Sequence, residues 1–257
     1  MRALAHWLTP ALALATLAVG LAACATLLQV PSSAGQTADD PQAAWDRVLR
    51  GHVLDDGGID FVGIRRDPED LEAFVAWVAT HGPRATPELF PTEAARLAYY
   101  LNAYNALAMY QVVTTPHRPE QRVRFFLLTT VVLDGQRTSL YRLENAVIRP
   151  LGDPRVHFAL NCMVRGCPRL PREPFDPSRL DAQLEREARH FLNEPRNIQV
   201  DPPVGVVRVS SILRFYREDF LAKAPSLVAY ANRYRTEPIP EHYAVRFIPY
   251  DWILHQR

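Results

Sequence analysis

The amino-acid sequence predicts an α+β fold: a single domain with a central buried helix, several packed helices and a small, mostly antiparallel sheet. Three observations lead to this prediction. An apolar stretch of helix-forming residues, AARLAYYLNAYNALAMYQVV, runs from 94 to 113 without a helix breaker. Short apolar runs bounded by Asp, Gly and Pro predict strands. No internal repeat and no second domain boundary interrupt the chain after residue 43.

The helices follow from apolar residues that recur at helical spacing and from their end signals. Thr92 is a suitable N-cap for the central helix because its hydroxyl can accept from the first free amides. Leu180, Leu184, Ala188 and Phe191 form one apolar stripe of a later helix. Helices are predicted at about 45–49, 67–80, 92–113, 139–152, 177–192, 212–222 and 227–234.

The strands follow from short apolar runs between turn residues. Asp134-Gly135 separates the runs 131–133 and 136–139, and this dipeptide favours a two-residue hairpin turn. The segment RVHFAL (155–160) is short and apolar and predicts a buried strand, with His157 on the opposite face from Val156 and Phe158. Further strands are predicted at 59–64, 204–209 and 244–254.

The first 23 residues predict a targeting segment: Arg2 precedes an apolar run and small residues. Leu21-Ala22-Ala23-Cys24 resembles the lipobox of bacterial lipoproteins, in which the cysteine is acylated. The alternative is an ordinary secretory signal in which Cys24 has no role. The predicted organisation is a signal peptide (1–23), a lipidated tether (24–42) and one domain (43–257).

The predicted location is the bacterial cell envelope. Ala25 after the cysteine resembles the pattern of outer-membrane lipoproteins, so the domain is expected to face the periplasm. The membrane, reached through Cys24, is the predicted partner, together with an unknown small molecule or envelope protein. The chain has 29 Lys and Arg against 28 Asp and Glu, and this balance argues against a nucleic-acid partner.

Cys162 and Cys167 have four alternative roles. A disulfide suits an oxidising compartment, although the short loop gives it only a modest effect on stability. Metal ligation together with His157 lacks an evident fourth ligand, so no metal and no cofactor are predicted. Cys162 can also act as a nucleophile next to His157, or remain an inert buried thiol. His157 itself is either a core histidine or a catalytic group.

Polar residues on apolar elements are the other candidates. Asn102 and Asn105 lie on one face of the central helix, where buried amides must hydrogen-bond either to a neighbouring loop or to a ligand. Glu144 can pair with a histidine as a base, or simply form an ion pair. The predicted ligand-lining residues are Asn102, Tyr104, Asn105, Arg149 and Asn161, and the predicted catalytic residues are Cys162, His157 and Glu144.

Several motifs together resemble the bacterial and plant proteins of domain-of-unknown-function family 547. They are LNAYNAL (101–107), LENAVIRP (143–150), DPRVHFALNC with GCP (153–168), FLNEPR (191–196), SSILRFYREDF (210–220) and FIPYDW (247–252). The resemblance implies motif roles for Asn102, Tyr104, Asn105, Glu144, Arg149, His157, Cys162 and Pro168, but no defined activity.

The resemblance also bears on the thiols. Plant members tend to carry serine where Cys167 stands, which implies that a disulfide is not required throughout the family. Asn145 stands where a histidine often follows the glutamate. The leading hypothesis is a membrane-anchored envelope lipoprotein with a polar cleft around Cys162 and His157, acting as a thiol-dependent hydrolase or transferase. The alternative is a noncatalytic binding or adaptor protein with a structural Cys162–Cys167 disulfide.

Overall fold

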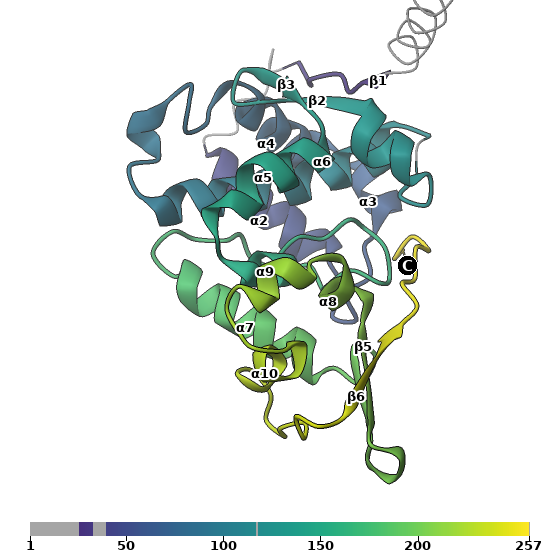
Figure 1. Cartoon of the computed structure of the whole chain (residues 1–257). Helices are drawn as coiled ribbons and strands as arrows, with labels where there is room; N and C mark the ends of the chain where they lie inside the picture. Colours follow the sequence, from purple (N-terminus) through teal and green to yellow (C-terminus); the bar gives the residue numbers. More distant parts are fainter. Residues whose placement is uncertain (1–25, 33–39, 117, 257) are drawn as a thin grey trace, which may run out of the picture.

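Helix α5 (Glu93–Thr114) runs through the middle of the computed structural model, which describes residues 26–32, 40–116 and 118–256 (Figure 1). The Thr92 hydroxyl accepts a hydrogen bond from the amide of Ala95 and thereby caps the helix, as the sequence predicts. Most of its side chains are buried, since other elements pack on all sides of it. The central buried helix of the predicted α+β fold is therefore confirmed.

The first core surrounds α5. Its helices are α2 (Pro41–His52), α3 (Phe61–Arg66), α4 (Glu69–Thr80) and α6 (Leu140–Arg142). Its sheet consists of β1 (Thr26–Leu27), β2 (Thr129–Leu133) and β3 (Gln136–Thr138), with β1 parallel and β3 antiparallel to β2. The predicted hairpin is present, and both Asp134 and Gly135 have the positive φ angles of its turn.

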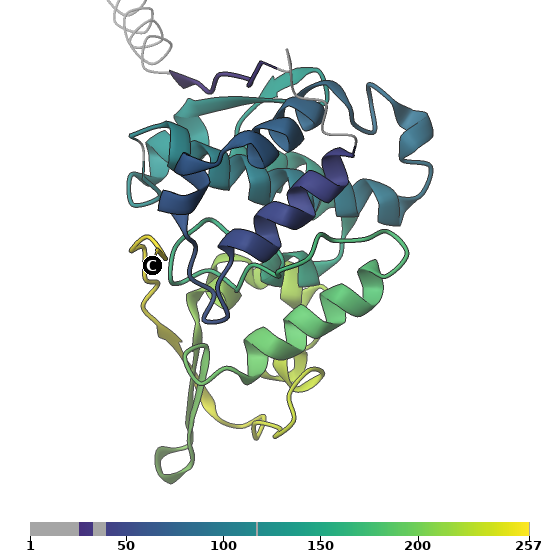
Figure 2. The same cartoon turned by 180° about the vertical axis from the view of Figure 1, so that it is seen from behind.

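A second, smaller core lies below the first in Figure 1. Its helices are α7 (Leu180–Asn193), α8 (Ser211–Phe215), α9 (Arg217–Leu221) and α10 (Leu227–Asn232). Its sheet has β5 (Val206–Ser210) in the middle, antiparallel to β4 (Ile198–Asp201) and parallel to β6 (Ala244–Ile248). The strands thus divide into two small sheets, each with one antiparallel and one parallel pair. Seen from behind, α2 (purple) and α7 (green) lie on the near side of the molecule (Figure 2).

Short helical turns connect these elements. Two are π-helices, η2 (Val123–Leu128) and η3 (Leu143–Ile148). The others are 3₁₀-helices: η1 (Pro87–Leu89), η4 (Arg149–Leu151), η5 (Pro154–Phe158) and η6 (Pro202–Val204). The predicted helix at 139–152 is therefore a continuous helical path, in which a π-helix lies between α6 and η4.

Two predicted strands are wrong. Residues 59–64 contain the start of α3 instead, because the Asp60 carboxylate accepts from the amide of Gly63 and caps a helix. Residues 155–160 are mostly the 3₁₀-helix η5, because Asp153 caps the turn and Pro154 occupies its first position. His157 consequently lies on a helical turn and does not alternate along a strand.

The ends of the described chain also differ from expectation. The strand predicted at 244–254 ends at Ile248, and the following residues make only single bridges, such as Val164 with Leu254. Within the expected tether, Thr26 and Leu27 pair with β2 and Leu28 is buried. The predicted leader (1–23) and Cys24 lie outside the described residues. Among the helices that the structure describes, none combines the length and apolar character needed to cross a membrane.

Candidate functional site

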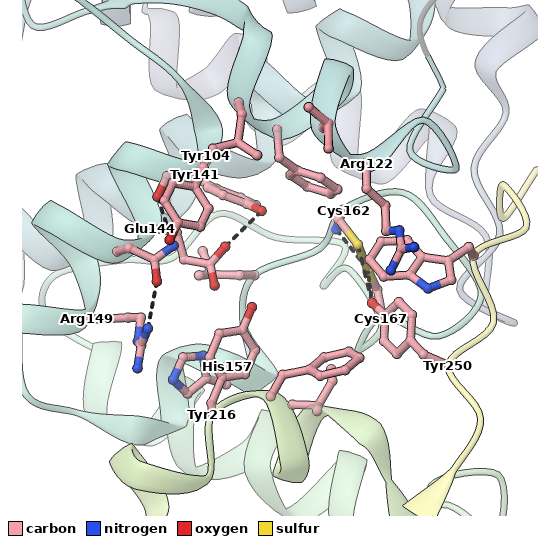
Figure 3. Close-up of a pocket in the computed structure, with 18 residues that line it drawn as sticks. Tyr104, Arg122, Tyr141, Glu144, Arg149, His157, Cys162, Cys167, Tyr216 and Tyr250 are labelled. Atoms are coloured by element: carbon pink, nitrogen blue, oxygen red, sulfur yellow. Dashed lines mark hydrogen bonds between the residues drawn. A yellow bond between two sulfur atoms is a disulfide. The ribbon is translucent and has the colours of Figure 1, made fainter. Parts of the chain in front are cut away.

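A cleft of about 620 Å³ lies between the two cores. Above it are α5 and η3, below it are α8 and the start of α9, and the loops around Cys162 and Tyr250 close one side (Figure 3). Its volume is in the range of small-molecule sites in proteins. The lining residues combine polar groups with apolar walls: Tyr104, Arg122, Val123, Phe126, Leu127, Tyr141, Glu144, Asn145, Arg149, His157, Leu160, Cys162, Cys167, Ile212, Phe215, Tyr216, Tyr250 and Trp252.

Glu144 is the acid of this cleft. It lies on the π-helix η3, a type of helical turn that occurs frequently at functional sites. The Tyr104 hydroxyl on α5 donates to Glu144 Oε2 at 3.4 Å, and the Tyr216 hydroxyl points toward the same carboxyl from below (Figure 3). The residue is only 7% exposed.

Burial raises the pKa of Glu144, because a carboxylate loses hydration in this position. Hydrogen bonding from Tyr216, the positive charge of Arg149 and hydrogen bonding from Tyr104 act in the opposite direction without cancelling the effect. Burial also raises the pKa values of Tyr104 and Tyr216 well above the usual range. Both phenols therefore keep their protons and can donate hydrogen bonds into the cleft.

His157 belongs to a network of hydrogen bonds and stacked rings on the lower side of the cleft. Its Nε2 lies 2.7 Å from Asp219 Oδ2, and Asp219 also accepts two hydrogen bonds from Arg149, each 2.8 Å long. The Tyr216 ring stacks on the imidazole with centroids 3.7 Å apart, while the Arg149 guanidinium lies over the same ring. Burial lowers the pKa of His157 to about 4, although Asp219 opposes this shift.

The two cysteines form a disulfide, the first of the alternatives considered for them. The Tyr250 hydroxyl lies 3.3 Å from the Cys162 sulfur and 3.2 Å from the Cys167 sulfur (Figure 3). The structure gives no hydrogen bond from either sulfur to His157 or Glu144 within the described part of the chain. The disulfide therefore forms a wall of the cleft, and Cys162 is not paired with a base.

The predicted ligand-lining asparagines hold backbone instead of facing this cleft. Asn102 accepts from the amide of Phe175 and donates to its carbonyl, and it contacts a different cavity beside α2. Asn105 donates to the Ala159 carbonyl and accepts from the amide of Asn161. In this way the oxygen and the nitrogen of each buried side-chain amide both have a hydrogen-bond partner.

Asn161 fixes the loop that carries the disulfide. Its amide donates to the Pro168 carbonyl, and its side-chain oxygen accepts from the amide of Met163, which has a positive φ. Of the predicted site residues, the cleft thus brings together Tyr104, Glu144, Arg149, His157, Cys162 and Cys167, whereas Asn102, Asn105 and Asn161 are not among its lining residues.

Sequence reasoning missed Tyr216, Asp219 and Tyr250, and the cation–π pair of Arg122 with Trp252. A signal for most of them was available, because they lie in SSILRFYREDF and FIPYDW, two of the motifs that carry the family resemblance. Metal chemistry has no evident support: across residues 26–32, 40–116 and 118–256, no group of three or more His, Cys, Asp or Glu side chains could hold an ion.

Comparison with known proteins gives one match. Residues 90–192 match the model of a family described as "Protein of unknown function, DUF547". No curated protein and no solved structure matches the chain. The matched segment contains Glu144, His157 and the disulfide, but ends before Tyr216 and Tyr250. Over residues 90–192 the chain is therefore similar to DUF547 proteins, as its motifs predict.

Proposed function

We propose that the cleft is an acid–base active site for a small molecule, and that Glu144 is its proton-exchanging group. One observation carries the proposal. Glu144 is a buried carboxyl with a raised pKa, and it lies on the wall of a cleft large enough for a ligand. Titratable groups that are perturbed by burial and face a cavity are frequent at catalytic sites.

The neighbouring groups suit hydrolysis or group transfer. A carboxyl whose pKa is raised by burial can take a proton from an attacking hydroxyl or water and return it to the leaving group. The Tyr104 and Tyr216 hydroxyls approach Glu144 from opposite sides and can donate to an oxygen on which negative charge develops.

The same geometry argues against a thiol-dependent reaction. The Cys162 sulfur is bonded to Cys167, so it cannot attack a substrate unless it is first reduced. His157 is held by Asp219 and has a pKa near 4, so it is a poor proton acceptor at neutral pH. A role for Glu144 needs neither reduction nor rearrangement.

We also propose that this is an envelope lipoprotein of the DUF547 family along its whole mature length. The leader with Cys24 supports export and acylation. The Cys162–Cys167 disulfide supports an oxidising compartment. The motifs at 210–220 and 247–252 support the family beyond the matched residues, because they supply Tyr216 and Tyr250 to the same cleft.

A panel of p-nitrophenyl esters, p-nitrophenyl glycosides and aminoacyl p-nitroanilides tests the reaction. Turnover by the wild-type protein that is lost in Glu144→Gln, but retained when Cys162 and Cys167 are both replaced by alanine, would support the proposal. Turnover that survives Glu144→Gln, or that disappears with the cysteines while the fold is intact, would refute it. Circular dichroism of each variant controls for folding.

The disulfide favours one second candidate, a noncatalytic envelope binding protein. In that case the Cys162–Cys167 bond and the asparagine contacts only keep the cleft in shape. A ligand that raises the melting temperature of the wild type and of Glu144→Gln equally, without turnover of any compound in the panel, would identify this function.

A further inference from the structure

We infer that the ligand of the cleft is an anionic amphiphile with one acyl chain, received at the surface of a membrane. The inference rests on the proposed function, since it assigns a chemical class to the ligand of the same cleft. Four groups of observations carry it: the mouth of the cleft, its one unpaired cation, its volume and the position of β1.

The mouth is lined by exposed apolar side chains. Val123, Leu127, Tyr141 and Phe215 are 60%, 46%, 47% and 43% exposed, and all four line the cleft. They come from η2, α6 and α8, elements on both sides of the opening. Single exposed apolar residues are ordinary on a protein surface, but a group of them around one opening indicates an apolar ligand or a membrane.

The rim of the cleft offers one exposed cation without a carboxylate partner among the described residues. Arg149 is neutralised by Asp219. Arg122, in contrast, lies over the Trp252 ring and forms no ion pair with the carboxylates of the described residues. A guanidinium in this position can bind a carboxylate or a phosphate through two hydrogen bonds.

The volume favours one chain. A cavity of about 620 Å³ is of the size that encloses one drug-sized ligand, not a lipid with two acyl chains. Phe126, Leu160 and Ile212 supply apolar walls between the mouth and the polar groups. An amphiphile can therefore place its head beside Arg122 and its chain along these apolar walls.

The position of β1 connects the mouth with the membrane. Thr26 pairs with Thr129, which directly follows η2 and lies two residues after Leu127. Thr26 lies two positions after Cys24, and this length of chain can span at most about 7 Å. An acylated Cys24 would therefore hold the membrane beside η2, the helix that supplies two of the four apolar side chains at the mouth.

Photochemical cross-linking tests this inference on the full acylated chain in phosphatidylcholine nanodiscs. The probe is a diazirine-labelled long-chain fatty acid, and cross-linked peptides are located by mass spectrometry. We expect labels in the peptides that contain Val123–Leu127 and Ile212–Tyr216. Leu127→Asp should lower this labelling about tenfold, because a carboxylate against an acyl chain costs at least about 1.4 kcal/mol.

The matched control is Val204→Asp, since Val204 is 64% exposed on η6, away from the cleft, and should leave labelling unchanged. Two further arms examine the head group. Arg122→Gln should reduce labelling by the fatty acid to that by the equivalent fatty alcohol. An excess of inorganic phosphate should not compete, whereas efficient competition would identify the ligand as a small free anion and overturn the inference.

Other results would also overturn it. These are equal labelling of wild type and Leu127→Asp, or labels confined to residues 26–32 next to the membrane. The proposed function is tested separately by turnover in Glu144→Gln. If Glu144→Gln abolishes turnover but the cleft is not labelled by the acyl probe, the active site is supported and the ligand class is refuted. If the cleft is labelled but the wild type turns over no compound, the ligand class is supported and the active site is refuted.

Discussion

Two acids near the cleft have different surroundings: Glu144 lines the cleft, whereas Asp219 holds Arg149 and His157, which line it from the lower side. Asp219 is one quarter exposed and accepts hydrogen bonds from Arg149 and His157, and the bonds from Arg149 lower its pKa. Glu144 is nearly buried and has only hydroxyl partners within hydrogen-bond reach, and burial raises its pKa.

This difference separates a structural acid from a reactive one. When the surroundings of two nearby carboxyls shift their pKa values in opposite directions, the two groups can have different roles. Asp219 stays charged and fixes the lower wall, whereas burial makes Glu144 easier to protonate than an ordinary glutamate. The comparison makes four predictions, from the largest expected change in the free energy of unfolding to the smallest.

A fall in pH should cause the largest loss in the free energy of unfolding, through His157 on the lower wall. The unfolded chain takes up a proton at the histidine near pH 6.5, but the folded protein resists protonation of His157 until about pH 4. Stability should therefore fall by about 3 kcal/mol between these pH values, at 1.36 kcal/mol per pKa unit. Urea unfolding at several pH values measures this loss.

The variant His157→Gln should lose less stability than the wild type over the same interval, and exposed His242→Gln should behave like the wild type. An NMR titration of the imidazole gives the same information without a variant. An imidazole that titrates near pH 6.5 in the folded protein would contradict this description of the lower wall.

Asp219→Asn should destabilise the protein by about 2 to 3 kcal/mol, because hydrogen bonds to charged groups are lost and Arg149 is left partly buried without a counter-charge. Asp181→Asn is the matched control, since Asp181 also pairs with an arginine but is 90% exposed. Chemical denaturation at pH 7 measures both variants. Equal midpoints would show that Asp219 does not fix the lower wall.

Removal of the disulfide should cost about 2 kcal/mol, because the bond closes only a short loop in the unfolded chain. The replacement of both Cys162 and Cys167 by alanine tests this by urea unfolding. Reductant should shift the wild-type midpoint in the same direction and leave the double variant unchanged. A wild type that is insensitive to reductant would show that the side wall does not depend on this bond.

Glu144→Gln should have the smallest effect, and of opposite sign. Because the folded-state pKa of Glu144 is raised, its ionisation weakens the fold as pH rises through that pKa. The variant should therefore melt above the wild type at pH 8 and together with it near pH 4. Glu187→Gln is the contrasting control, since it deprives Arg169 and Arg186 of a buried partner and should lower the melting temperature. A Glu144→Gln variant less stable than wild type at pH 8 would contradict the difference between the two acids.

The fold was more predictable than the site. Local signals such as the Thr92 cap and the Asp134-Gly135 turn act within a few residues, so the sequence reveals them directly. The strand predicted at His157 failed because Pro154 and the Asp153 cap dominate over the apolar pattern of the segment. The division into two sheets depends on the parallel partners of β2 and β5, which are distant in the sequence.

The site depends on contacts between distant segments, which no local pattern encodes. Asp219 comes to His157 across 62 positions, and Tyr250 reaches Cys162 across 88. The asparagines of α5 present a different difficulty. The sequence predicts that their buried amides form hydrogen bonds, but it does not show whether the partner is a ligand or a loop. In the structure Asn105 donates to the carbonyl of Ala159, so its partner is a loop and not a ligand.

The π-helix η3 gives the cleft an unusual tolerance of one deletion. The amide of Arg149 donates to the carbonyl of Glu144, five residues earlier, whereas an α-helix joins residues four apart. Deletion of Val147 would make this an ordinary α-helical bond, so Arg149 should still reach Asp219. Deletion of both Ala146 and Val147 should instead turn Arg149 by about 100° and break these bonds. A pH titration of His157 that moves in the single-deletion variant would show that the extra residue of the π turn is needed to place Arg149.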